Sequence, residues 1–125
     1  MSKIAILLLA AGASARMRGR DKLMEDIEGA PLLSLICSRA AQTELPCYVT
    51  LPSPTHPRSS ATGSAQVIPV PNAAEGMAVS IRTGIAALPP TIDAVMILPC
   101  DMPELQTQDL LDLAAQFQGP DGPVL

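Results

Sequence analysis

Aromatic residues are almost absent from this chain, which has one Phe, one Tyr and no Trp, together 2% of its residues. Hydrophobic residues nevertheless make up 48% of the sequence. A hydrophobic core is therefore expected to consist of Leu, Ile, Val, Ala and Met side chains. A length of 125 residues predicts a single domain.

An excess of positive charge is also missing, because the formal net charge is −4. Proteins that bind nucleic acid in general carry a basic surface, so we do not expect nucleic acid as a partner. The charge is unevenly distributed, since seven of the eight Lys and Arg residues precede residue 60 and acidic residues dominate the second half. This distribution predicts an anionic ligand near the N-terminal part and a metal ion near the later acids.

Cysteine pairs and long apolar runs are missing as well. The three cysteines, at 37, 47 and 100, are odd in number and have no CxxC spacing, which favours reduced thiols in a cytoplasmic protein. The apolar run Ile4–Leu9 is too short to span a membrane, and no cleavage-site pattern follows it. We expect a soluble cytoplasmic protein without a membrane partner. Cys100 is not expected to be a nucleophile, because the sequence pairs no His with it.

Strand and helix patterns alternate along the chain. Ile4–Leu9 is uniformly apolar, as in a strand buried on both faces of a parallel sheet. Three further strands are expected at 47–51, 66–70 and 93–98, with a surface loop at 52–65. Pro31 is expected to open a helix with an apolar face at 32, 33, 35, 36 and 40. Two more helices are expected, one at 72–88 with a face at 77, 81, 85 and 88, and one with a face at 110, 113, 114 and 117. This alternation predicts an α/β fold with a mainly parallel sheet, in which ligands bind beyond the carboxyl ends of the strands.

The loop after the first strand combines small residues with positive charge. Its first residues are Leu9, Ala10, Ala11, Gly12, Ala13 and Ser14, and four cations follow at 16, 18, 20 and 22. It is neither a Walker A element nor a GxGxxG loop. A small-residue turn is common in α/β folds, and the cations could form a solvated face. The combination equally suits a triphosphate, which needs close backbone approach and charge neutralisation.

Two later segments are candidates for the same site. Asp101 directly follows the strand at 93–98 and its Pro99-Cys100 extension, where a carboxylate can hold Mg²⁺ together with substrate phosphates. Asp101 could instead cap a helix after Pro103. Gly76 allows close approach at a helix entry, and Ser80 lies one turn further on.

A capping pair of Asn72 with Glu75 is the structural alternative for the segment around Gly76. A lone loop histidine is usually solvated, so His56 is given no role.

The stretch Leu9-Ala10-Ala11-Gly12-Ala13-Ser14-Ala15-Arg16-Met17, followed by Asp21-Lys22-Leu23, resembles the LAAGxSxRM…K motif of nucleotidyltransferases with an NTP-transferase domain. The resemblance extends to the segments 72–80 and 98–103, and points to molybdenum cofactor cytidylyltransferases and their molybdopterin guanylyltransferase relatives. It implies a Rossmann-like three-layer sandwich of the nucleotide-diphospho-sugar transferase type.

The resemblance also implies a reaction and a set of site residues. An acceptor phosphate attacks the α-phosphorus of an NTP, pyrophosphate leaves with Mg²⁺, and the protein contributes positioning and charge neutralisation. By the family pattern, the catalytic residues are Arg16 and Lys22 on the phosphates, with Lys22 near the α-phosphate, and Asp101 as the Mg²⁺ ligand. The implied nucleotide-binding residues are Leu9, Ala10, Ala11, Gly12, Ala13, Ser14, Arg16, Lys22, Asn72, Gly76 and Ser80.

The resemblance indicates the identity of the nucleotide base and of the acceptor less directly than it indicates the reaction. Guanylyl-transferring relatives tend to have Gly where this chain has Ala11, and the added methyl group narrows the base pocket. We therefore expect CTP as the favoured NTP and a phosphorylated small molecule, molybdopterin cofactor, as the acceptor. A sugar-phosphate or isoprenoid nucleotidyltransferase, and a nucleotide-binding accessory protein without turnover, remain alternatives.

Residues 1–125 are expected to form the N-terminal, nucleotide-binding portion of the family domain. Gly122-Pro123-Val124-Leu125 has the pattern of a strand that is just beginning, whereas the resembling domain continues further. We expect either a truncated product that lacks part of the acceptor side or a sheet that a partner chain completes. Separately from that alternative, the expected protein partners are a molybdoenzyme or a second copy of this chain.

Overall fold

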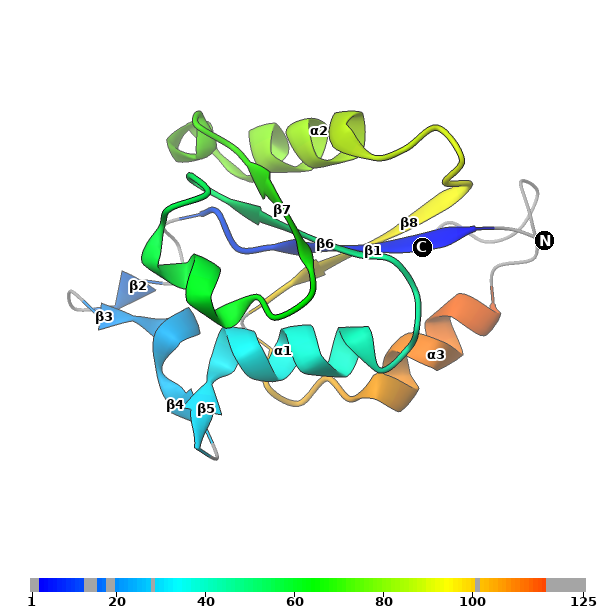
Figure 1. The fold of residues 1–125 in the computed structure, drawn as a ribbon, viewed down its shortest axis with the longest axis horizontal. Helices are drawn as coiled ribbons and strands as arrows, with labels where there is room; N and C mark the ends of the chain where they lie inside the picture. Colours follow the sequence, from blue (N-terminus) through cyan, green and yellow to red (C-terminus); the bar gives the residue numbers. More distant parts are fainter. Residues whose placement is uncertain (1–2, 13–15, 18–19, 28, 101, 117–125) are drawn as a thin grey trace.

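A computed structural model describes residues 3–12, 16–17, 20–27, 29–100 and 102–116 of this chain. Its central sheet has four parallel strands in the order β7-β6-β1-β8 (Figure 1). The strands are β1 (Ile4–Leu9), β6 (Cys47–Leu51), β7 (Gln66–Pro69) and β8 (Ala94–Pro99). The predicted α/β class with a mainly parallel sheet is confirmed, and all four predicted strands are present within one or two residues.

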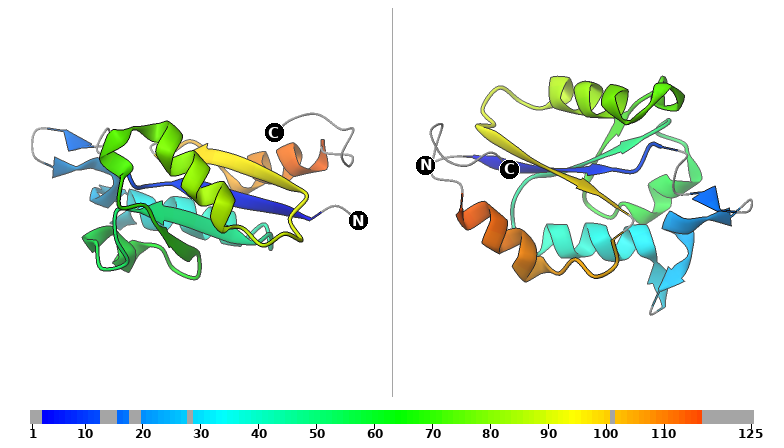
Figure 2. Two further views of the ribbon diagram at one scale, coloured as in Figure 1. Left: turned by 90° about the horizontal axis from the view of Figure 1, so that it is seen from above. Right: turned by 180° about the vertical axis from the view of Figure 1, so that it is seen from behind.

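Helices cover both faces of the sheet. In Figures 1 and 2, α2 (Met77–Ala87) lies on one face, and α1 (Leu32–Ala41) and α3 (Thr107–Ala115) lie on the other. Strand β1 contributes alternate side chains to two hydrophobic clusters: Ile6 and Leu8 pack with residues of α1, while Ala5 and Leu7 belong to the cluster on the opposite face. This two-sided burial explains why the run 4–9 is continuously apolar.

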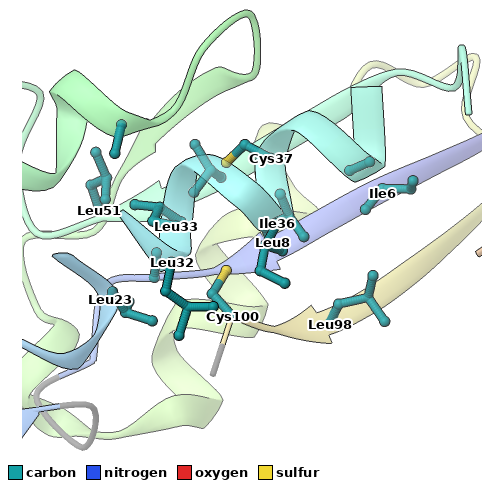
Figure 3. Close-up of a cluster of buried hydrophobic side chains, with 14 of the residues drawn as sticks. Ile6, Leu8, Leu23, Leu32, Leu33, Ile36, Cys37, Leu51, Leu98 and Cys100 are labelled. Carbon is teal, nitrogen blue, oxygen red and sulfur yellow. The ribbon is translucent and has the colours of Figure 1, made fainter. Parts of the chain in front are cut away.

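The helix expected after Pro31 forms as predicted. Pro31 occupies the N-cap of α1, where its missing N–H costs no helical hydrogen bond. The helix buries Leu32, Leu33, Ile36, Cys37 and Ala40 in one cluster with Leu8 of β1 and Leu98 of β8. Figure 3 shows this cluster, with all of these residues except Ala40 labelled. Leu35, also predicted on this face, is half-buried.

Two small hairpins and a short helix connect β1 to α1. Strand β2 (Arg16–Met17) pairs antiparallel with β3 (Arg20–Asp21), and β4 (Asp26–Ile27) pairs with β5 (Ala30–Pro31). The 3₁₀ helix η1 (Lys22–Met24) lies between the hairpins and buries Leu23 in the core beneath α1. The cation-rich segment is therefore part of a folded connection between β1 and α1, and Leu23 anchors this connection in the core.

The apolar face predicted for the second helix is only partly confirmed: Ile81 and Leu88 are half-buried, whereas Met77 and Ile85 are exposed. Instead of one helix over 72–88, a 3₁₀ turn η3 (Ala73–Glu75) precedes α2, and Met77 and Ile85 are 59% and 44% exposed. The residues that α2 buries are Ser80 and Gly84. A Cβ atom on Gly84 would lie 2.8 Å from Cδ2 of Leu7, so the helix approaches the sheet along its smallest residue.

The expected surface loop at 52–65 contains a 3₁₀ helix, η2 (Pro57–Ala61), that buries Arg58 and Ala61. Pro57 at its first turn and the His56 side chain as its N-cap explain why it forms. The prediction of a simple surface loop was therefore incomplete.

The alternative role for Asp101, capping a helix after Pro103, is not borne out. Helix α3 begins at Thr107, and its N-cap is Gln106, in a capping box with Asp109. Of its predicted face, Leu110 is buried and Leu113 and Ala114 pack against the main core. Phe117 and the chain end from Gly119 to Leu125 lie outside the described residues, so the expected strand there is not tested.

The three cysteines form no disulfide, and Cys37 and Cys100 are buried. Burial, with a smaller contribution from Cys47, raises the pKa of Cys37 to about 12, and burial also raises the pKa of Cys47. Since the thiolate is the reactive form, neither of these two cysteines is a nucleophile at neutral pH. No helix in the described part of the chain has the length and apolar character needed to cross a bilayer.

The close approach at Gly84 predicts an unusual response to Gly84→Ala. In an open helix this change stabilises by about 1 kcal/mol, whereas overpacking a tight contact costs about 1–3 kcal/mol. We expect a net loss of up to about 2 kcal/mol in the free energy of unfolding measured with urea. In a Leu7→Ala background the same change should be stabilising, because the obstructing methyl groups are gone. Equal effects in both backgrounds would refute this packing account.

Candidate functional site

Three loops leave the sheet at one edge. Leu9, the last residue of β1, is in register with Thr50 of β6 and with Pro99 of β8. The chain order reverses here, because β6 and β7 extend to one side of β1 while β8 returns to the other side. Such a reversal opens a crevice beyond the carboxyl ends of the strands, where open α/β sheets bind their ligands. The loop after β1 begins in this crevice.

Ala10 is held on both sides of its backbone. Its N–H group donates to the carbonyl oxygen and to Oγ1 of Thr50, both at 3.2 Å. Its own carbonyl oxygen accepts from Nη1 of Arg58 at 2.5 Å. Ala10 and Thr50 are buried, so these bonds form away from water and fix the start of the loop firmly.

Arg58 is the central polar group of this region. Its side chain is 2% exposed, and its guanidinium binds both oxygens of Asp21, with Nε to Oδ2 at 2.6 Å and Nη2 to Oδ1 at 3.0 Å. Nη1 also donates to the carbonyl oxygen of Gly12 at 3.1 Å. A planar fork facing a carboxylate is the strongest form of this ion pair.

Asp21 connects Arg58 to the cationic segment at 16–22. Its Oδ1 also accepts from the N–H of Leu23 at 3.2 Å, which makes Asp21 the N-cap of η1. Lys22 is the first residue of that helix, and Arg16 is in backbone register with Asp21 across the β2-β3 hairpin. Arg16, Asp21 and Lys22 are thus neighbours in the fold, as the proposed phosphate-binding role requires.

A hollow of about 250 Å³ opens beside the loop, between the carboxyl ends of β1, β6 and β7. Ala11 and Gly12 form one wall, and Arg58 and His56 form part of another. Nδ1 of His56 accepts from the backbone N–H of Arg58 at 3.1 Å, so this nitrogen carries no proton. The remaining lining residues are Pro52, Pro71, Ala73 and Ala74.

The segment predicted to line the base side lies partly at this hollow. Asn72 and Gly76 are exposed and flank the lining residues 73–74, whereas Ser80 is buried and is not among the lining residues. Gly76 has φ 125° and ψ 171°, a conformation that other residues rarely adopt, although a Cβ would meet nothing within 4 Å. The glycine is therefore required by backbone geometry rather than by crowding. Asn72 makes no side-chain cap, so the capping alternative is not borne out.

Asp101, Ala13 and Ser14 lie outside the described residues, and the side chain of Arg16 is not described. The segment after Asp101 is tied to α1, because Nη1 of Arg39 donates to the carbonyl oxygens of Pro103 and Leu105 at 2.6 and 2.7 Å. Within the described ranges, no three His, Cys, Asp or Glu side chains gather where they could hold a metal.

Sequence reasoning missed Arg58 and His56. A signal existed, because Arg58 is the one charged residue in the stretch 52–65, and Pro57 marks the first turn of a helix. That signal predicts a short helix but not that the arginine points inward to the loop after β1.

Comparison with known proteins supplies the family. Residues 6–125 match the family described as the MobA-like NTP transferase domain. The chain belongs to this family. It is 30% identical over 117 residues to a probable molybdenum cofactor guanylyltransferase of Trichormus variabilis, a match that covers 94% of this chain and 55% of that protein. The chain thus spans about half the length of the curated relatives that it matches.

Solved structures with the same fold include Rv0371c of Mycobacterium tuberculosis, with a TM-score of 0.77 and 23% identity over 91% of this chain and 59% of that one. A manganese complex of Rv0371c aligns with a TM-score of 0.73 and 19% identity, over the same shares of the two chains. CMP:2-keto-3-deoxy-manno-octonic acid synthetase in complex with CTP aligns with a TM-score of 0.73 and 22% identity, over 91% of this chain and 46% of that one. These likenesses confirm the nucleotide-diphospho-sugar transferase type of fold.

The buried ion pair predicts an asymmetric response to substitution. Arg58→Met removes the guanidinium that binds both oxygens of Asp21 and should cost about 3 kcal/mol in the free energy of unfolding, measured with urea. Arg39→Met is the matched control, because it removes two hydrogen bonds to carbonyl oxygens but does not break an ion pair with a carboxylate. It should lower the free energy of unfolding by about 1–2 kcal/mol. Adding Asp21→Asn to Arg58→Met should recover part of the loss. A double variant less stable than Arg58→Met alone would contradict the buried-charge explanation.

Proposed function

We propose that this chain is the nucleotide-binding portion, residues 1–125, of a nucleotidyltransferase domain. It would move a nucleotidyl group from an NTP to a phosphorylated small molecule, molybdopterin cofactor, and release pyrophosphate. One observation carries the proposal: a loop of small residues lies at the switch point of a parallel sheet, joined through Arg58 and Asp21 to the turn that begins with Lys22. Membership in the MobA-like family and the name of the curated relatives support the reaction class.

Each site residue has a physical role in this proposal. The hollow beside Ala11 and Gly12 would take the base and ribose, with the rim at 72–76 on its far side. Lys22 would act as a point charge on the α-phosphate, and Arg16 as a fork on the phosphate oxygens. In-line transfer asks for little covalent help from the protein, so positioning and charge neutralisation account for most of the catalysis.

A divalent cation suits the proposed chemistry, because one carboxylate that shares the ion with substrate phosphates is an arrangement typical of Mg²⁺ sites. We propose Asp101, which follows β8 in the sequence, as that ligand, and the manganese complex of Rv0371c is consistent with a divalent ion in this fold. When bound, the ion would neutralise phosphate charge. The absence of disulfides among the three cysteines favours a reducing cytoplasm as the place where the protein acts.

Lys22→Ala tests the proposal. Calorimetry with CTP, GTP, ATP and UTP in Mg²⁺ should detect binding of at least one NTP by the unmodified chain. Pyrophosphate release with CTP, Mg²⁺ and molybdopterin cofactor should fall about 10²–10³-fold in the variant, as when one donor to a developing charge is removed. Lys3→Ala, at the opposite end of β1, is the control and should change neither measurement.

The outcomes of the Lys22 test separate the alternatives. If no NTP binds, the whole proposal is wrong. Binding without pyrophosphate release favours the nucleotide-binding accessory protein. Release with a sugar phosphate or an isoprenoid phosphate, but not with molybdopterin cofactor, favours the other nucleotidyltransferases. Unchanged turnover in Lys22→Ala would refute the role of that residue alone.

The base preference depends on Ala11. Its methyl group is buried with Val70 and Ala73 at the wall of the hollow, where a smaller residue would leave more room for a purine. We propose CTP as the favoured substrate, although the curated relatives are named guanylyltransferases. Calorimetry should show tighter binding of CTP than of GTP, and Ala11→Gly should shift the ratio of the two dissociation constants toward GTP by about tenfold, the effect of one methyl group. A wild-type preference for GTP would overturn this assignment.

A further inference from the structure

We propose that Arg58 is a positioning residue for nucleotide transfer, which sets the spacing between the nucleotide loop (residues 9–12) and Lys22. This inference rests on the proposed function. Arg58 comes from η2, far from both elements in the sequence, and binds the loop at Ala10 and Gly12 and the residue before Lys22, Asp21, through hydrogen bonds at 2.5–3.1 Å. The groups expected to hold the two ends of the nucleotide are therefore linked through one side chain.

The geometry of the guanidinium makes this link rigid. Nε and Nη2 face the carboxylate of Asp21, and Nη1 faces the carbonyl oxygens of the loop. Because the guanidinium is planar and its donors have a fixed arrangement, the distance between the carboxylate and the carbonyls is fixed as well. A lysine at this position would keep the positive charge, but it has neither the paired donors that bind both oxygens of a carboxylate nor a further N–H group for the loop carbonyls.

Arg58 also orients the peptide groups of the loop. The carbonyl of Ala10 points toward Nη1, and in a trans peptide the following N–H points the opposite way. The N–H of Ala11 is therefore directed away from Arg58. Thr50 holds the N–H of Ala10, which belongs to the preceding peptide, so the peptide groups on both sides of the Ala10 Cα are hydrogen-bonded. Backbone N–H groups with a fixed direction are what an anionic ligand requires at such a loop.

The second contact acts on charge as well as on position. Asp21 is the residue directly before Lys22 and is 15% exposed. The bidentate pair with Arg58 neutralises this carboxylate next to the residue that is expected to bind phosphate. Arg58 thus supports the position of Lys22 through the η1 cap and reduces the repulsion between Asp21 and the phosphates.

A double-mutant cycle between Arg58 and Lys22 tests the inference. Calorimetry would measure CTP binding in Mg²⁺ for the unmodified chain, Arg58→Lys, Lys22→Ala and the double variant. Arg58→Lys alone should weaken binding by about tenfold to a hundredfold, the scale of a misplacement of about 1 Å. In the Arg58→Lys background, Lys22→Ala should have at most about one-third of its wild-type effect, because a misplaced Lys22 has less binding to lose.

Two controls separate positioning from stability. Ile4→Ala removes a buried side chain at the amino end of β1, and should lower the melting temperature without changing CTP affinity or the effect of Lys22→Ala. If Arg58→Lys does not fold, Asp21→Asn breaks the same link from the other side, and the same cycle with Lys22→Ala applies. Hydrogen exchange at the amides of Ala10 and Leu23 should accelerate together in either link variant.

The outcomes are distinct. Sub-additive effects on CTP binding support the inference. Fully additive effects, or equal coupling with Ile4→Ala, overturn it and leave the proposed function intact. If the unmodified chain binds none of the four NTPs, the proposed function fails and this inference fails with it.

Discussion

The structure around the site depends on one buried guanidinium. Arg58 donates to two backbone carbonyls and to both oxygens of a carboxylate in a largely buried region. The desolvation of a charge is costly, and it is offset here because the ion pair is bidentate and the other edge of the guanidinium also finds acceptors. A single interaction thus fixes the loop after β1, the turn that bears Lys22 and the position of η2. None of these segments has enough regular secondary structure to hold itself.

The sheet provides the frame that this interaction completes. Parallel pairing of β1 with β6 and β8 brings Leu9, Thr50 and Pro99 to one edge, and this places the three loops together before any side chain is considered. On the face of α2, Gly84 lets the helix lie directly against Leu7. The frame is therefore tightly packed behind the site, and the polar contacts of Arg58 stabilise the irregular backbone in front of it.

Local signals in the sequence were sufficient for most of the frame. The apolar run 4–9 and Pro31 each determine their element through properties of the residues themselves, namely burial on two faces and a fixed φ angle. The face of α2 and the direction of Arg58 could not be read in this way. Both depend on a partner far along the chain, Leu7 in one case and Asp21 in the other. The helical period predicted burial of the large apolar residues at 77, 81, 85 and 88, whereas the residues that α2 buries are the small Ser80 and Gly84.

The distribution of charge can be interpreted more narrowly with the contacts known. The cations in the first half of the sequence predicted an anionic ligand, yet Arg39 and Arg58 donate to backbone carbonyls, and Arg58 also neutralises Asp21. Their charges serve the fold. The positive charge left for a phosphate near the nucleotide loop is therefore concentrated at 16–22, directly after that loop. An arginine in a sequence is thus weak evidence for a phosphate site until its hydrogen-bond partners are known. Because the guanidinium of Arg58 already binds Asp21 and backbone carbonyls, the cations at 16–22 are the better candidates for binding phosphate.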